Sequence, residues 1–433
     1  MSTDHLKKPT FSASTRSLHE PLPKPDPHGA LSMPIYESVA FGFDNSEDIE
    51  AAFKGRKAAH TYSRISNPTI DHFERKVKTL SGAFGVLAVS SGMASISMTL
   101  ASLLQAGDEV LANHHLFGNT YSLLSRTLGQ WGLKTRFEDL TGTPDKNGKL
   151  PDRDAEKNRI DALISPNTRL IYVETLTNPQ LEIPDFSLLS ELAREHKIPF
   201  VADTTMTPPY LFDAKAAGVD IELLSSTKYM SGGATSVGGL IIDHGTFDWK
   251  SHHLLASLGK SFGPHAFLAS LRQRVYRDFG ACLSPQHAWL QSLGLDTLAL
   301  RVDRSLTTTR QLSAFLQHHP KIGFVSYPDI PESPWHQRAK TFFPKGSGGV
   351  ISFGLADKSA CFRFMNALRL VRRATNIHDN KTLIIHPAST IFGEYDEAMR
   401  KVLGVPDTLL RLSVGIEDAA DLQTDISLAL EAL

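Results

Sequence analysis

Short apolar runs alternate with helical patterns through the middle of this chain, and this alternation limits the folds that it can adopt. Strands joined by helices usually pair in parallel, and a parallel sheet is covered on both faces. We therefore expect an α/β fold with a mostly parallel central sheet, helices on both faces, and ligands at the carboxyl ends of the strands. The predicted strands are residues 85–90, 109–112, 135–137, 170–174, 199–203, 221–224 and 237–242, and helices are predicted at 94–104, 186–196 and 211–217.

The two ends of the chain differ from this middle part. Residues 1–41 are rich in Ser, Pro and His, with prolines at 21, 23, 25 and 27, which predicts an extended arm. Beyond Cys282, one long helix at 295–318, strands at 349–355, 382–385 and 409–414, and helices at 359–371 and 419–433 predict a smaller α+β domain. We divide the 433 residues into an amino-terminal arm (1–61), a large domain (62–282) and a carboxyl-terminal α+β domain (283–433).

Composition excludes several classes of protein. The formal net charge is -1, which gives no overall electrostatic basis for binding nucleic acid or an acidic membrane surface. Cys282 and Cys361 are the only cysteines and the histidines lack metal-ligand spacing, so neither a disulfide framework nor a metal site is predicted. No apolar run approaches membrane-spanning length, and residues 1–9 lack the apolar core of a signal peptide. We expect a cytoplasmic protein with no membrane or nucleic-acid partner.

One lysine follows a predicted buried strand. Lys228 comes just after the apolar run 221–224, between the hydroxyl residues Ser225 and Thr227 and the glycines at 232 and 233. Burying an ammonium group is costly, so such a lysine shifts its pKa or finds a partner, and a lysine with a lowered pKa suits imine chemistry. The hydroxyls suit a phosphate. The alternative is a strand end whose lysine extends to solvent.

Other strand ends also carry polar residues. Asp203 follows an apolar run and precedes Thr205; it needs a cationic partner such as a protonated pyridine nitrogen, or it caps the next helix. Asn178 follows the strand that ends at Glu174 and is placed to donate to a ring oxygen, or it forms an Asn-Pro turn. Residues 90–93 join a strand to a helix, and a helix start of this kind favours a phosphate.

Two arginines are candidates for binding anions. Tyr62 and Arg64 stand two positions apart in a polar loop, so in extended chain their side chains project the same way and suit a phosphate clamp. The alternative is a solvated loop. Arg411 lies within the apolar strand 409–414, where a bidentate guanidinium suits a substrate carboxylate, and an internal salt bridge is the alternative.

Taken together, these motifs resemble the Cys/Met-metabolism (trans-sulfuration) family of pyridoxal-phosphate enzymes from about Pro34 onward. The resemblance implies an aspartate-aminotransferase-like fold of type I, with an arm, a large cofactor-binding domain and a smaller carboxyl-terminal domain. The motifs that carry it are Tyr62-Ser63-Arg64, Ser91-Gly92-Met93, Glu174 with Asn178-Pro179, Asp203, Ser225-Ser226-Thr227-Lys228-Tyr229, His386-Pro387-Ala388-Ser389 and Arg411-Leu412-Ser413.

The resemblance implies pyridoxal 5′-phosphate as the cofactor and gives roles to these residues. Lys228 is implied as the catalytic Schiff-base lysine, Asp203 as the partner of the pyridine nitrogen, and Asn178 as the donor to the ring hydroxyl. The other implied cofactor contacts are Gly92, Met93, Phe117, Thr205, Ser225 and Thr227 of the same chain, with Tyr62 and Arg64 of a neighbouring subunit. The implied substrate contacts are Arg411, Asn376 and Ile377. A homo-oligomer follows, expected to be a tetramer built from dimers that share active sites.

Two departures from the family pattern bear on the reaction. Phe117 stands where the family usually has a Tyr that stacks on the cofactor ring; stacking survives, but a phenol that moves protons does not. In the loop 375–379, Asn376 replaces the Ser of many lyases and the uncharged Thr375 replaces the Glu of cystathionine lyases. This loop is most similar to the O-acetylhomoserine sulfhydrylase branch, although His378 replaces that branch's usual Gly.

The resemblance thus predicts γ-replacement on an O-acylhomoserine by a sulfur nucleophile, in sulfur amino-acid metabolism. The alternatives within the family are a γ-lyase acting on cystathionine or methionine, and a cystathionine γ-synthase. Outside these, a non-catalytic homologue that binds the cofactor and an aldolase-type barrel that uses Lys228 also remain open.

Overall fold

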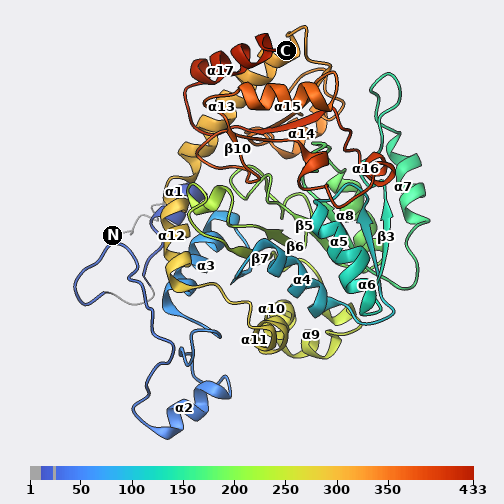
Figure 1. Ribbon diagram of the computed structural model, residues 1–433. Coiled ribbons are helices and arrows are strands. Elements are labelled where there is room, and N and C mark those ends of the chain that lie inside the picture. The colour runs from blue at the N-terminus through green and yellow to red at the C-terminus, as the bar shows by residue number, and fades with distance from the viewer. Residues whose placement is uncertain (1–10, 23–25) are drawn as a thin grey trace, which may run out of the picture.

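The computed structural model describes residues 11–22 and 26–433. A seven-stranded sheet forms the centre of the larger part of the molecule, and a five-stranded sheet forms the smaller carboxyl-terminal part above it in Figure 1. The larger sheet is open, and its strand β7 runs in the direction opposite to the other six strands. The predicted α/β class with a smaller second domain is therefore confirmed, and the aldolase-type barrel is excluded.

Both sheets have non-sequential strand orders. The larger sheet has the order β1-β7-β6-β5-β4-β2-β3 and the smaller one β10-β11-β12-β9-β8. The strands are β1 (Gly85–Val89), β2 (Glu109–Asn113), β3 (Lys134–Glu138), β4 (Thr168–Glu174), β5 (Phe200–Asp203), β6 (Ile221–Leu224), β7 (Gly239–Asp243), β8 (Phe324–Ser326), β9 (Val350–Gly354), β10 (Arg372–Arg373), β11 (Leu383–Ile385) and β12 (Leu409–Ser413).

Helices lie on both sides of the larger sheet and on the outer side of the smaller one (Figure 1). They are α1 (Ala13–Leu18), α2 (Ser46–Phe53), α3 (Pro68–Ser81), α4 (Gly92–Leu103), α5 (Gly118–Ser122), α6 (Leu128–Gln130), α7 (Arg153–Asp161), α8 (Phe186–Glu195), α9 (Ala256–Phe262), α10 (Ala266–Leu271), α11 (Arg277–Phe279), α12 (Pro285–Asp296), α13 (Leu298–Gln317), α14 (His336–Phe342), α15 (Lys358–Ala367), α16 (Glu397–Val402) and α17 (Ala419–Glu431).

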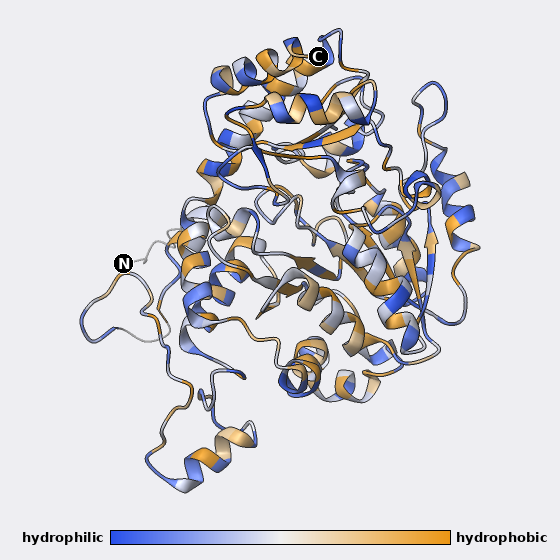
Figure 2. Cartoon of the chain, in the orientation of Figure 1, coloured by the Kyte–Doolittle hydropathy of each residue, from blue (hydrophilic) through white to orange (hydrophobic). Residues whose placement is uncertain are grey.

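Strand β5 shows why the central runs are continuously apolar. Phe200 and Ala202 pack in one core cluster with residues of α8, while Val201 packs on the opposite face with residues of α4. Successive side chains of a strand point to opposite faces, so a sheet covered on both sides needs an apolar residue at every position. Figure 2 shows the same arrangement, with hydrophobic strands in the interior and amphipathic helices around them.

Three predicted elements differ from the structure. Residues 211–217 form turns rather than a helix; the segment is short, follows two prolines and ends at Gly218, whose φ is 82°. The predicted helix 295–318 is two helices, α12 and α13, separated at Thr297. The amino-terminal arm contains the helix α1, which is held by a bond from Ser17 Oγ to the carbonyl oxygen of Lys76 at 2.9 Å. The remaining predicted arm positions 1–10 and 23–25 lie outside the described residues.

The segment that carries α2 lies away from both sheets, at the lower left of Figure 1. It includes apolar side chains that are largely open to solvent, such as Phe53 at 74% and Val39 at 58% exposure. Within the described ranges, every helix is too short or too polar to span a lipid bilayer.

Candidate active site

The carboxyl ends of the parallel strands bring the candidate residues to one edge of the larger sheet. Glu174 ends β4 and Asp203 ends β5, and these two residues are paired in the sheet register. Ser225 begins the segment that follows β6, the neighbour of β5. Turns after these strands therefore meet at a single place, where β12 of the smaller sheet contributes Arg411.

Lys228 is a half-buried amine at this edge. Its Nζ donates a hydrogen bond to Oδ1 of Asn376 at 2.6 Å, which ties the loop before β11 to the segment after β6. Burial and, to a smaller extent, the positive charge of Arg411 lower the pKa of Lys228 to about 8, against the opposing effect of Asp379. An amine with this pKa is partly neutral near physiological pH, as imine formation requires.

Asp203 is a carboxylate without a cationic side chain beside it among the described residues. Its Oδ1 accepts the backbone N–H of Thr205 at 2.8 Å. Burial, with a smaller contribution from the nearby Glu222, raises the pKa of Asp203 to about 6, although the bonds from Thr205 partly oppose this rise. The Oγ1 of Thr205 accepts the backbone N–H of Ser225 at 2.9 Å, so Thr205 joins Asp203 to the segment that carries Lys228.

The turn before α4 packs closely against the same segment. Ser91 caps the helix by accepting the N–H of Ala94 at 3.1 Å. A Cβ added at Gly92 would lie 2.7 Å from the Cβ of Ser225, so only glycine fits this close approach. The first N–H groups of a helix have no intrahelical acceptor, so those of Gly92 and Met93, at the start of α4, are left for another acceptor.

Arg411 is fully enclosed, with 2% of its surface exposed. Its guanidinium donates to Oδ1 of Asn178 at 2.9 Å and to the carbonyl oxygen of Thr375 at 3.1 Å. No carboxylate pairs with it in residues 11–22 and 26–433, so the salt-bridge alternative is wrong. Burial lowers the pKa of Arg411 to about 9, which marks a cation held without a counter-charge.

Three other residues predicted to contact the cofactor or the substrate differ in their burial and hydrogen bonding. Phe117 is half-buried, and its backbone N–H donates to Oε1 of Glu174 at 2.6 Å. The Oγ1 of Thr227 bonds to the backbone of Gly238, accepting the N–H at 3.0 Å. Ile377 is 5% exposed and its side chain packs in an apolar core cluster, so the structure does not present this side chain to a substrate.

Tyr62 and Arg64 are not brought to this site within the chain. Tyr62 is 43% exposed, and the guanidinium carbon of Arg64 lies 5.5 Å from the centre of its ring, so the two side chains do project together. Arg64 also donates to the backbone oxygen of Arg277, far from Lys228 in the sequence. Their contribution to a cofactor site stays a prediction that requires a second chain.

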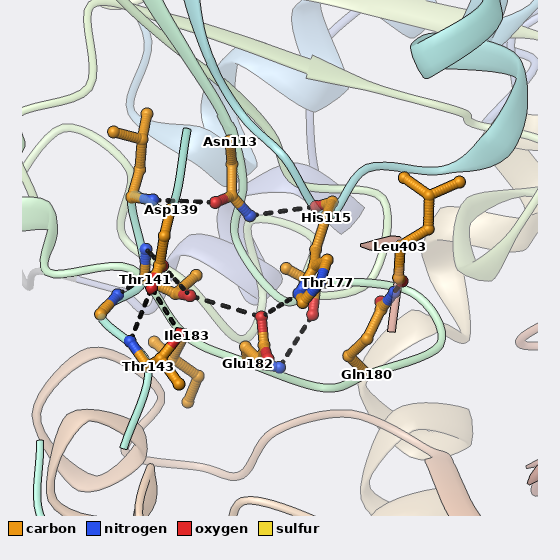
Figure 3. Close-up of polar contacts among 12 residues, drawn as sticks. Asn113, His115, Asp139, Thr141, Thr143, Thr177, Gln180, Glu182, Ile183 and Leu403 are labelled. Atoms are coloured by element: carbon orange, nitrogen blue, oxygen red, sulfur yellow. Dashed lines mark hydrogen bonds and ion pairs between the residues drawn. The ribbon is translucent and has the colours of Figure 1, made fainter. Parts of the chain in front are cut away.

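The sequence analysis did not predict a polar network that lies beside the site (Figure 3). Asp139 follows β3 and accepts bonds from the backbone and hydroxyl groups of Thr141 and Thr143 at 2.6–3.0 Å. Glu182, in the loop after β4 that also carries Asn178, accepts from Nδ1 of His115 at 2.7 Å. Residues 139–143 have the sequence Asp-Leu-Thr-Gly-Thr. An acidic residue just after a strand, followed by hydroxyl residues, is a pattern from which these hydrogen bonds could have been predicted.

The side chains present suit pyridoxal phosphate. A pyridinium nitrogen would supply the positive charge that the buried Asp203 lacks, and the close turn at Gly92 presents N–H groups suited to a phosphate. The oxygen of Asn178 is taken by Arg411, which leaves its amide nitrogen to donate. No group of three or more metal-ligating side chains occurs in the part of the chain that the structure describes.

Comparison with known proteins agrees with this chemistry. The family model described as Cys/Met metabolism PLP-dependent enzyme matches residues 14–431. The chain belongs to this family, and its cofactor is pyridoxal phosphate.

Three relatives illustrate the range of activities in the family. A crystal structure from Campylobacter jejuni, which carries a pyridoxyl-lysine phosphate group, superposes with a TM-score of 0.90 at 31% identity, covering 97% of this chain and 100% of that one. O-Acetylhomoserine sulfhydrylase of Wolinella succinogenes is 45% identical with a TM-score of 0.74, covering 85% and 99%. L-Methionine gamma-lyase of Pseudomonas putida is 35% identical over 98% of both chains.

Proposed function

We propose that this chain catalyses γ-replacement on an O-acylhomoserine, joining the four-carbon amino acid to a sulfur nucleophile such as sulfide or methanethiol. Family membership supplies the reaction class, and relatives named O-acetylhomoserine sulfhydrylase support the choice within it. The observation that carries the proposal is the pair of uncharged residues Thr375 and Asn376, which bond directly to Arg411 and Lys228.

Each proposed role follows from a contact in the chain. Arg411 binds the α-carboxylate of the substrate, because it is a buried guanidinium without an acidic partner in the described chain. Asp203 holds a proton on the pyridine nitrogen, and residues 92–93 with Ser225 and Thr227 bind the phosphate.

Lys228 anchors the cofactor and moves protons. Bound pyridoxal phosphate supplies an electron sink that stabilises negative charge on carbons of the substrate. Released from the cofactor, the Lys228 amine has a pKa of about 8, which suits a group that takes a proton from one carbon and delivers it to another. Phe117 has no hydroxyl, so proton transfer is assigned to Lys228 rather than to that position.

The loop at Thr375 and Asn376 also favours a short substrate. Cystathionine carries a second amino-acid head, and the uncharged side chains of Thr375 and Asn376 give that head no ionic partner, a loss of about 1–3 kcal/mol. An acetyl ester loses nothing there. We therefore expect O-acetylhomoserine to have a higher specificity constant than cystathionine.

The test compares kcat/KM for O-acetylhomoserine with sulfide, O-succinylhomoserine with sulfide, cystathionine and methionine on one preparation. The proposal expects the acetyl ester to give the highest value. A higher kcat/KM for cystathionine or methionine would instead make the protein a γ-lyase. That is the second candidate function, because L-methionine gamma-lyase is among the relatives.

A matched pair of variants sharpens this test. Thr375→Glu adds a carboxylate where the structure has none, and should raise kcat/KM for cystathionine about tenfold relative to O-acetylhomoserine. Thr375→Gln has nearly the same size without the charge, and should leave that ratio unchanged. Equal effects of the two variants would show that charge at this position does not select the substrate.

We also propose that the enzyme is a cytoplasmic homo-oligomer, a tetramer built from two dimers that share active sites, with residues 1–61 as an arm, 62–282 as the cofactor domain and 283–433 as the smaller domain. The exposed pair Tyr62 and Arg64 supports a shared site, since it follows α2, which extends from the body of the chain (Figure 1), and comes before α3. Mixing Arg64→Ala chains with Lys228→Ala chains should restore part of the activity. Verified mixed oligomers with no recovery would show that the clamp is not shared.

A further inference from the structure

His378 has a backbone conformation that is unusual for its residue type. Its φ is 56°, in the left-handed region where a Cβ is unfavourable and glycine is the usual occupant. The same position was noted above as glycine in the O-acetylhomoserine sulfhydrylase branch. Glycine would remove the strain, so the retention of a bulky ring here points to a use for the side chain.

The imidazole is packed between the segments that carry Lys228 and Arg411. It is 2% exposed and stacks on the ring of Tyr229, with centroids 3.9 Å apart and planes at 17°. Tyr229 directly follows Lys228, and its hydroxyl accepts the N–H of Gly349 at 2.9 Å. The backbone N–H of His378 donates to Oγ of Ser413 at 2.7 Å, two residues beyond Arg411 on β12.

The ring is neutral and its nitrogens are unused within the chain. Burial lowers the pKa of His378 well below its usual value, and the charges of Lys228 and Arg411 lower it further. The carboxylate of Asp379 acts on Lys228, but it does not offset the lowering of the pKa of His378. Neither Nδ1 nor Nε2 has a hydrogen-bond partner among the described residues. A neutral imidazole must carry one N–H and one free lone pair, so an acceptor without a donor is buried here.

Arg411 supplies the complementary atom. Its terminal nitrogens donate to Asn178 and Thr375, whereas its Nε–H has no acceptor among the described residues although it is buried. The unused acceptor of His378 is thus buried where the charge of Arg411 acts on it, and Arg411 itself holds the unused donor. Stacking alone does not explain the histidine, because phenylalanine would stack equally well without burying two polar nitrogens.

We propose that His378 is a positioning residue for Arg411: one nitrogen of its neutral ring accepts the Nε–H of Arg411 when the guanidinium binds the carboxylate of an amino acid. The stack on Tyr229 holds the ring in the orientation that this bond requires. The proposal rests on the proposed function only in the assignment of the amino-acid carboxylate to Arg411.

The experiment measures ligand binding to the holoenzyme from the visible absorption of its cofactor. Two ligands are compared, norvaline and butylamine, which differ by the carboxylate. Four variants separate the possible roles. His378→Phe keeps the stack and removes the acceptor, His378→Asn tolerates the left-handed backbone and keeps an acceptor, and His378→Gly removes both strain and side chain. The control is Lys197→Gly, which relieves another left-handed residue (φ 53°) on the exposed surface.

We expect His378→Phe and His378→Gly to raise the dissociation constant of norvaline about tenfold, while butylamine changes less than about twofold. His378→Asn should stay within about threefold of the wild type for both ligands, and Lys197→Gly should change neither. Because His378→Gly has no strained Cβ, it provides the result if the phenylalanine variant does not fold.

Three results would overturn the proposal: unchanged norvaline binding in both the phenylalanine and glycine variants, equal weakening of norvaline and butylamine, or an asparagine variant as impaired as the phenylalanine one. Norvaline carries no leaving group and no thiol is added. The outcome is therefore independent of whether γ-replacement is the reaction catalysed.

Discussion

Two polar regions at the same edge of the larger sheet differ in how completely they are bonded. In the network of Figure 3, Asp139 receives bonds from the backbone and side chains of Thr141 and Thr143, and Glu182 receives one from His115. Around Lys228 and Arg411, by contrast, the ring of His378 and Nε of Arg411 are buried without partners in the described chain.

The pKa values follow this difference. Burial raises the pKa of Asp139, but the bonds from Thr143 and Thr141 outweigh it and lower the pKa to about 2. At the other region burial prevails, so the pKa of Asp203 rises to about 6 and that of Lys228 falls to about 8. A folded chain rarely leaves buried polar atoms unpaired, so the carboxylates Asp139 and Glu182 are satisfied within the chain, and we propose that the second region is completed by cofactor and substrate.

The largest effect is expected at Lys228. Lys228→Ala removes the amine that we propose anchors the cofactor and moves protons, so kcat should fall by about 10⁴-fold or more while the thermal midpoint changes little. Turnover assays and thermal unfolding measure the two quantities. Lys215→Ala, at an exposed lysine, is the control and should be active. Normal turnover in the Lys228 variant with every candidate substrate would contradict the assignment.

A smaller loss of activity is expected at Asp203. Asp203→Asn keeps the shape but cannot hold a proton on the pyridine nitrogen, so kcat should drop about 100-fold with the cofactor still bound. Because the variant also removes a buried carboxylate that lacks a cation in the chain, stability without cofactor should not fall. Steady-state rates together with cofactor content test both statements, and a near-normal rate in the loaded variant would count against the role.

Replacing Asp139 should have the opposite outcome to replacing Asp203: a small loss of stability with little change in activity. The pKa of Asp139 is depressed from 3.8 to about 2 in the fold, so its contribution is fully present above about pH 4 and is lost as the pH falls toward 2. Asp139→Asn should lower the free energy of unfolding by about 1–2 kcal/mol at pH 7, a value reduced for partial exposure.

Urea unfolding of wild type and Asp139→Asn at pH 7 and at about pH 2.5 checks this sign. The difference between the two proteins should shrink at the lower pH, and kcat at pH 7 should stay within about twofold of the wild type. A constant difference in unfolding free energy at both pH values would mean that the carboxylate charge is not what stabilises this network.

The site was predictable from sequence because its residues follow apolar strands. Lys228, Asp203 and Asn178 each stand at or just past a predicted strand end, and the sheet order then brings them together. The lone arginine in an apolar strand, Arg411, was equally visible, although only the structure shows that no acid pairs with it in the described chain.

Other features depend on contacts that are distant in sequence. The break at Thr297 falls within a continuous helical pattern, and the short helix α1 is held by a contact with α3, so neither is visible in local periodicity. The left-handed backbone at His378 and the network around Glu182 arise from loops that meet only in the folded chain.

The most direct test of the account is the site of cofactor attachment. Reduction of the yellow holoenzyme with borohydride, followed by proteolysis and mass spectrometry, identifies the lysine that holds pyridoxal phosphate. The account predicts a phosphopyridoxyl group on Lys228 and none on other lysines. A group on a different lysine, or a chain that binds the cofactor without a reducible bond, would contradict it.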